Sequence, residues 1–146
     1  MLFRSEGTVD KFIGDAMMVI WGAPVTHTDD AARACFAAID IQRELVNFNT
    51  SLRARGQKEI RIGIGINTGS LVAGYIGSTQ TMSYSVIGDT VNTASRICSA
   101  AKAGQIIISE NTRKEVHTIF NMDALNPIQA KGKFQPVKVF NVTGKR

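Results

Sequence analysis

The chain has 146 residues, of which 44% are hydrophobic and 20% are charged. A chain of this length can bury a sizeable core, and the composition excludes a disordered, collagen-like or coiled-coil protein. Seventeen basic and twelve acidic residues give a net charge of +5. The basic residues do not cluster enough to indicate nucleic-acid binding, so the excess positive charge favours a small anionic ligand instead.

The sequence has no targeting or membrane signal. No apolar run reaches the roughly 20 residues that span a bilayer, and residues 1–7 are too short and too polar for a signal peptide. Cys35 and Cys98 lie far apart, without the CxxC spacing of a metal or redox motif. These features predict a reduced, cytoplasmic segment that makes no contact with a membrane. Without repeats or low-complexity linkers, we expect one domain.

The first third of the chain predicts a β-hairpin followed by a long helix. Two apolar runs, 8–13 and 16–21, flank Gly14 and Asp15, which suit a tight turn. The helix is expected to begin with Thr28 as its N-cap and to end at Gly56. One face of this helix is predicted to pack on the core, through Cys35, Ala38, Ile41, Leu45, Phe48 and Leu52.

The middle of the chain predicts further strands. Isoleucines alternate with other residues over 60–67, which indicates a strand with one apolar face. Gly63 and Gly65 lie on the other face, where they would let a second backbone or a helix approach closely. Two more strands are predicted over 71–76 and 84–87.

The last third predicts a helix, a buried strand and a short second helix. The first helix spans 89–101 with Asp89 as its N-cap, the strand spans 106–108, and Ser109 caps a helix that ends near 116. Segments 128–131 and 137–142 are expected to pair as antiparallel strands. Hairpins mixed with helices predict an α+β fold, a two-layer sandwich with a largely antiparallel sheet.

Common nucleotide and catalytic motifs are absent. There is no GxxxxGK[ST] loop, and the glycines at 63, 65 and 69 have the wrong spacing and context for a dinucleotide-binding GxGxxG turn. His27 and His117 are isolated, which favours ordinary surface or capping roles. The two cysteines and the methionines at 17 and 18 are interpreted as packing residues.

Three polar residues are candidates for chemistry. Asp15, at the predicted hairpin turn, is either a turn former or a ligand of a divalent metal, since Mg²⁺ is usually held by one or two carboxylates together with substrate phosphates. Asn92 and Arg96 lie four residues apart on a predicted helix and share a face. That face is either solvated or directed at a ligand, with Arg96 as a donor to phosphate oxygens.

Three segments, taken in order, resemble one family. They are VDKFIGDAMM at 9–18, RIGIGINTG at 61–69 and YSVIGDTVNTASR at 84–96, and the tail AKGK at 130–133 is similar to the same family's closing segment. Together they resemble the catalytic domain of class III nucleotide cyclases, over essentially the whole chain and most closely a bacterial-type adenylate cyclase. The resemblance implies a ferredoxin-like fold, two bound Mg²⁺ or Mn²⁺ ions, and a homodimer with its active sites at the interface.

The resemblance also implies roles for individual residues. Asp15 corresponds to a metal-binding aspartate, Asn92 to the residue that orients the ribose, and Arg96 to the one that stabilises charge on the reacting phosphates. Lys131 corresponds to a residue that binds the terminal phosphates. Lys11 and Ser85 fall where the family reads the purine, and lysine at the first position is typical of adenine-selective members.

The resemblance implies the conversion of ATP to 3′,5′-cyclic AMP and pyrophosphate, in signal transduction. One element of the pattern is missing: the family has a second metal-binding aspartate, on a strand upstream of the hairpin. The expectation is therefore that residues 1–146 lack the first strand and following helices of the domain, and are inactive alone. Two alternatives stay open, a catalytically inactive regulatory or dimerisation module and a guanylate cyclase. Family members are often fused to sensor or membrane domains, so the resemblance leaves the anchoring of the parent protein open.

Overall fold

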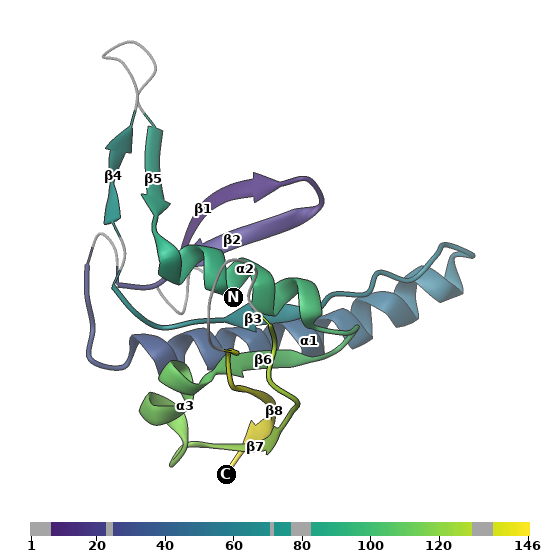
Figure 1. Cartoon of the computed structure of the whole chain (residues 1–146). Coiled ribbons are helices and arrows are strands. Elements are labelled where there is room, and N and C mark those ends of the chain that lie inside the picture. Colours follow the sequence, from purple (N-terminus) through teal and green to yellow (C-terminus); the bar gives the residue numbers. More distant parts are fainter. Residues whose placement is uncertain (1–6, 23–24, 71, 77–82, 130–135) are drawn as a thin grey trace.

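The computed structural model describes residues 7–22, 25–70, 72–76, 83–129 and 136–146. It contains eleven helices and strands within those ranges (Figure 1). The chain opens with the predicted hairpin, in which β1 (Thr8–Ile13) pairs with the antiparallel strand β2 (Ala16–Ile20). Gly14 in the turn has φ +61°, a conformation that favours glycine. The tight turn at this position is therefore confirmed.

Helix α1 (Asp30–Ala54) follows, and its two ends differ in how well the sequence predicted them. The N-cap is Asp29 and not Thr28, and no side chain caps the helix there. The Asp29 carboxylate instead accepts a hydrogen bond from Nε of Arg33 at 2.9 Å. The C-terminal end is as predicted: Gly56, at φ +70°, donates to Arg53 O while Gln57 donates to Leu52 O. This pair of bonds is a Schellman motif, which uses the carbonyls that the helix leaves unpaired.

The apolar face of α1 packs on the core along only part of its length. Cys35, Ala38 and Leu52 are buried as predicted. Phe48 is 47% exposed, so its assignment to the core was wrong. Figure 1 shows the reason, because the C-terminal part of α1 extends beyond the central sheet.

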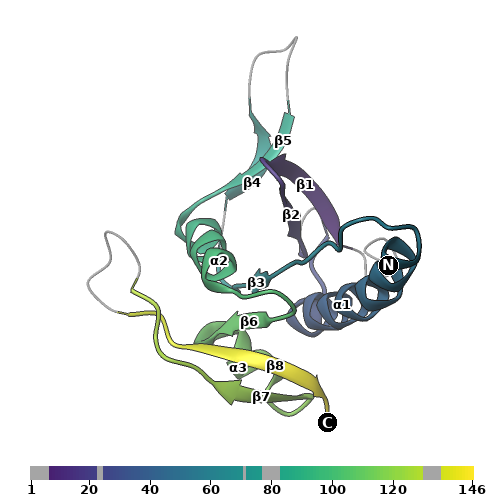
Figure 2. The same cartoon turned by 90° about the vertical axis from the view of Figure 1, so that its right-hand side faces the viewer.

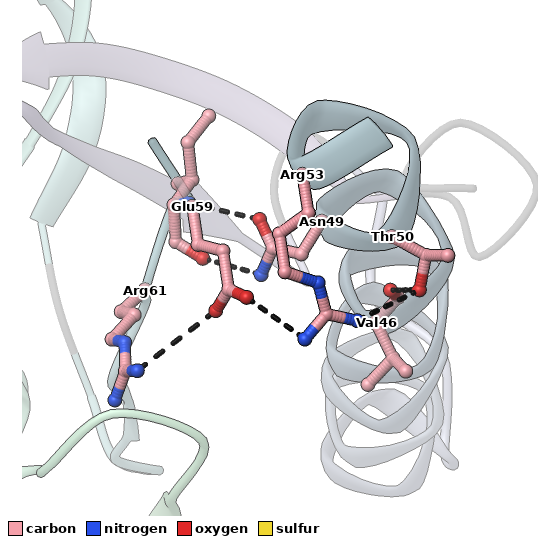
Figure 3. Close-up of polar contacts among 7 residues, drawn as sticks. Val46, Asn49, Thr50, Arg53, Glu59 and Arg61 are labelled. Carbon is pink, nitrogen blue, oxygen red and sulfur yellow. Dashed lines mark hydrogen bonds and ion pairs between the residues drawn. The ribbon is translucent and has the colours of Figure 1, made fainter. Parts of the chain in front are cut away.

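The segment that leads into β3 is held along α1 by side chains and not by a strand partner. Asn49 donates to Ile60 O and accepts from Ile60 N, both at 2.8 Å (Figure 3). Arg53 forms an ion pair with Glu59 at 3.0 Å beside this contact. Strand β3 (Ile64–Ile66) therefore begins later than the alternating pattern predicted. The backbone N–H and C=O of Ile60 form hydrogen bonds with the Asn49 side chain and not with a neighbouring strand.

A four-stranded sheet forms the centre of the molecule, in the order β3-β6-β8-β7. Its other strands are β6 (Ile106–Ser109), β7 (Phe120–Ala124) and β8 (Val139–Lys145). Within the described residues β3 and β6 are the one parallel pair, and the remaining pairs are antiparallel. Of the predicted pairing of 128–131 with 137–142, the described residues show one bridge, between Ile128 and Val137, and residues 130 and 131 lie outside the described part of the chain. Strand β8 instead pairs with β6 and β7, because burial of Val139 and Val142 in the sheet outweighs the local hairpin.

A second hairpin and two helices complete the fold. Strand β4 (Val72–Ile76) pairs with β5 (Ser83–Ile87), which leads directly into α2 (Asp89–Ala100). The N-cap of α2 is Gly88, at φ +138°, and not Asp89, which lies in the first turn. Helix α3 (Glu110–Val116) begins at the predicted cap, where the Ser109 side chain accepts from Thr112 N.

Helices cover both faces of the central sheet, as Figure 2 shows, with α1 and α2 on opposite sides of β3. Successive side chains of β6 point to opposite faces of the sheet. Ile106 and Ile108 therefore pack in one core, and Ile107 packs in the other. The first core contains Cys35 of α1 and Phe120, and the second contains Ile97 of α2. Three helices combined with mostly antiparallel strand pairs confirm the predicted α+β fold class within the described residues. No helix of the described residues is long and apolar enough to cross a membrane.

Candidate functional site

Helix α2 carries two of the predicted site residues and lies directly on the backbone of β3. A Cβ atom at Gly65 would lie 2.3 Å from the backbone nitrogen of Cys98, and one at Gly63 would lie 2.7 Å from Ala101 O. Both distances are shorter than any real carbon contact, so only glycine fits at these two positions. The predicted close approach to this strand is therefore confirmed, and the approaching element is α2.

Asn92 and Arg96 are one turn apart on this helix. Asn92 is exposed, and Arg96 is partly exposed. The buried side of α2 is formed by Thr93 and Ile97. Val91, Ala94 and Cys98 are only half-buried, because the helix is rotated so that Ile97 enters the second core. The shared face of Asn92 and Arg96 leaves both side chains accessible to a ligand.

Asp15 lies in the turn between β1 and β2 and is exposed. In Figure 1 this turn points away from the β4–β5 hairpin. The structure thus keeps Asp15 at the far end of its hairpin from β5, the strand that carries Ser85.

The remaining predicted residues are placed by their backbone alone or lie outside the described part of the chain. Lys11 lies in β1 opposite Met18, and Ser85 lies in β5 opposite Gly74. Strands β1 and β5 contact each other within the chain. Lys131 lies outside the described residues.

The described side chains provide only some of the ligands that a metal ion would need. Among the described residues no three His, Cys, Asp or Glu side chains come together as a metal cluster. Asp15 supplies one exposed carboxylate. A single carboxylate fits Mg²⁺ when substrate phosphates and another carboxylate provide the other oxygens. The residues present therefore fit one part of such a site.

Sequence reasoning missed a group of polar side chains beneath α2, the hydroxyl–amide cluster of Asn67, Thr68, Ser109 and Thr112. Ser109 and Thr112 are 3% and 0% exposed. Ser109 Oγ donates to Asn67 Oδ1 at 2.6 Å, and Thr68 Oγ1 lies 2.8 Å from Thr112 Oγ1. Asn67 Nδ2 donates to Thr90 O, in the first turn of α2, at 3.0 Å. The sequence signal that could have revealed this cluster was Asn67, a polar residue directly after the run of alternating isoleucines.

The cysteines are not candidates for catalysis. Cys35 is fully buried in the first core, and burial raises the pKa of its thiol from 9.0 to about 12. Cys98 is half-buried, and its Sγ lies 3.6 Å from Gly63 O. The interpretation of Cys35 as a packing residue agrees with this burial.

Comparison with known proteins assigns the family. Residues 6–144 match the model of the adenylate and guanylate cyclase catalytic domain. Adenylate cyclase 1 of Rhizobium meliloti (strain 1021) is 33% identical over 95% of this chain, which spans 21% of that protein.

Solved structures give the same result. The adenylyl cyclase CyaB from P. aeruginosa matches with a TM-score of 0.94 and 34% identity, over 99% of this chain and 76% of that one. The guanylyl cyclase Cya2 matches with a TM-score of 0.93 and 36% identity, over 99% of this chain and 74% of that one. The resemblance drawn from the three motifs is thereby confirmed at the level of family and fold: this chain belongs to the adenylate and guanylate cyclase catalytic domain family.

Proposed function

We propose that the domain is an adenylate cyclase, which converts ATP to 3′,5′-cyclic AMP and pyrophosphate. The observation that carries this proposal is the placement of Asn92 and Arg96 on one accessible face of α2, directly after the strand that holds Ser85. The family assignment supports a cyclase, and an adenylate cyclase is among the relatives.

The reaction requires a ribose 3′-hydroxyl to attack the α-phosphorus of the same nucleotide. The new bond joins O3′ to that phosphorus, the bond to the β-phosphate oxygen breaks, and pyrophosphate leaves with the electron pair while the hydroxyl proton passes to solvent. Asn92 holds the sugar in this geometry, and such positioning can lower a barrier by several kcal/mol. Arg96 and Lys131 donate to phosphate oxygens as negative charge grows on them.

A divalent metal would be held by Asp15 with a second carboxylate and the phosphates. When bound, Mg²⁺ or Mn²⁺ lowers the pKa of the attacking hydroxyl and offsets the charge of the triphosphate. The contribution of this chain is the exposed carboxylate of Asp15, presented on the turn of the β1–β2 hairpin.

The choice of base is assigned to Lys11 and Ser85. Adenine offers a ring-nitrogen acceptor and an amino donor, so a lysine donor and a serine acceptor are complementary to it. The neighbouring positions of β1 and β5 support a shared role. A guanylate cyclase is the second candidate, because Cya2 has comparable identity and structural similarity to this chain.

Two copies are proposed to form each site. The turn with Asp15 points away from the β4–β5 hairpin within one chain (Figure 1). A metal carboxylate from one protomer and a purine pocket from its partner would meet across a twofold interface, which gives a homodimer with two equivalent sites.

The test is a direct assay of the purified full-length protein with Mn²⁺-ATP and with Mn²⁺-GTP. Cyclic AMP formation faster than cyclic GMP formation supports the proposal. Faster cyclic GMP formation supports the guanylate cyclase, and no product from either nucleotide, with nucleotide binding retained, supports an inactive regulatory module.

A further inference from the structure

The hydroxyl–amide cluster joins three elements that meet below the proposed site. Asn67 directly follows β3, Ser109 is the N-cap of α3, and Thr90 lies in the first turn of α2. Asn67 contacts both of the others, through its Oδ1 and Nδ2 atoms. One side-chain amide therefore links the sheet, α3 and the helix that carries Asn92 and Arg96.

The orientation of the Asn67 amide is fixed by its partners. Thr90 O can only accept a hydrogen bond, so the group that faces it must be the amide nitrogen. The amide oxygen then faces Ser109, whose hydroxyl donates to it at 2.6 Å. Since Ser109 has one proton to give, it is the acceptor in its hydrogen bond with Thr112 N. A flipped amide would set oxygen against oxygen at Thr90.

The first turn of α2 also contacts the segment that follows Asn67, at Gly69 and Ser70. Thr90 Oγ1 donates to Ser70 O, and a Cβ atom at Gly69 would lie 2.7 Å from Thr90 Oγ1. Two residues further along, Asn92 N donates to Gly88 O. Thr90 and Asn92 share the first turn of α2, so a displacement of Thr90 would shift the turn that carries Asn92.

We infer that Asn67 is a positioning residue for the cyclase reaction, acting through α2 on Asn92 and Arg96. This inference rests on the proposed function. Asn67 does not touch substrate; it sets the position of the helix whose side chains do. Misplacement of a catalytic group by about 1 Å can cost about a hundredfold in rate, so a loosened first turn is enough to slow the reaction.

The main variant is Asn67→Asp, which keeps the size of the side chain but places an acceptor against Thr90 O. We expect kcat for cyclic AMP formation to fall about tenfold or more, with KM for Mn²⁺-ATP changed less than about threefold. Ser99→Ala is the matched control: it removes an exposed hydrogen bond to Ser95 O near the other end of α2, and should leave both constants unchanged.

A coupling measurement separates positioning from a general loss of stability. In an Arg96→Lys background, Asn67→Asp should reduce kcat much less than it does in the wild type, because the group that it positions is already altered. Independent, multiplicative effects of the two changes would overturn the inference. Asn67→Ala, which removes both hydrogen bonds without adding a charge, repeats the test if the aspartate variant does not fold.

Hydrogen exchange keeps this inference distinct from the proposed function. Amide exchange at Asn92 and Thr93 should be faster in Asn67→Asp than in the wild type, while exchange in β6 stays unchanged. If the wild type forms no cyclic nucleotide from ATP or GTP, the proposed function fails, and the exchange data still decide whether Asn67 holds α2. Equal exchange at Asn92 in the two proteins would overturn the inference.

Discussion

Gly65 of β3 and Cys98 of α2 are in direct backbone contact: a Cβ atom on the glycine would lie 2.3 Å from the nitrogen of the cysteine. The contact fixes how deeply α2 lies on the sheet and thus where Asn92 and Arg96 are presented. It is also a contact with backbone, which cannot move aside as the end of a long side chain can.

Replacing Gly65 with alanine should destabilise the domain, by about 1–3 kcal/mol, because α2 must lift from β3 to accept the methyl group. Chemical denaturation monitored by circular dichroism measures the change. The matched control is Gly144→Ala in β8, where a Cβ atom would meet nothing within 4 Å. A Gly65→Ala protein as stable as the Gly144→Ala protein would contradict the close contact.

Replacing Lys11 with glutamate should shift base selectivity away from ATP, since a carboxylate acceptor would then face the ring-nitrogen acceptor of adenine. We expect the ratio of kcat/KM for ATP to that for GTP to fall at least tenfold, which corresponds to about 1.4 kcal/mol. Thr143→Val, an exposed change in β8, is the control for expression and folding. An unchanged ratio would remove Lys11 from the purine site.

Mixing two inactive full-length variants should restore activity if sites are shared between protomers. Asp15→Ala and Arg96→Ala are each expected to abolish cyclic AMP formation. In a heterodimer one site receives both changes and the other receives neither, so up to half of the wild-type activity should return. Differently tagged protomers, purified as proven heterodimers, provide the measurement. Heterodimers as inactive as either parent would show that Asp15 and Arg96 serve the same site from one chain.

The buried thiol of Cys35 should make stability depend on alkaline pH. Its pKa is raised to about 12 in the folded state by burial, from an ordinary value of 9.0. Between these values the unfolded chain releases the proton and the folded chain keeps it, so the free energy of unfolding falls as pH rises above about 9, by at most about 1.4 kcal/mol per pH unit.

Urea denaturation at pH 8, 9 and 10 tests this dependence. Cys35→Ala should show a shallower decline than the wild type, and Cys98→Ala should keep the wild-type slope, because no buried thiol is lost. The same slope in the Cys35→Ala protein and the wild type would assign the alkaline instability to other groups.

The sequence by itself determined the local elements and the family. Gly14 and Asp15 indicated the first hairpin, Gly56 indicated the end of α1, and Ser109 indicated the cap of α3, because turns and caps depend on a few neighbouring residues. The alternation of isoleucine with glycine over 62–66 also indicated correctly that another element would lie close to this strand. The order, the spacing and the residues of three motifs were enough to identify the cyclase family.

The tertiary structure decided what depends on contacts between distant segments. Strand β8 pairs with β6 and β7 and not mainly with the segment at 128, because burial of Val139 in a sheet exceeds the gain from a local hairpin. Phe48 is exposed although its spacing matches the apolar face, because α1 is longer than the sheet beside it. The link from Asn67 to Thr90 and Ser109 spans 23 and 42 residues, and only folding brings those hydrogen-bonding groups within reach.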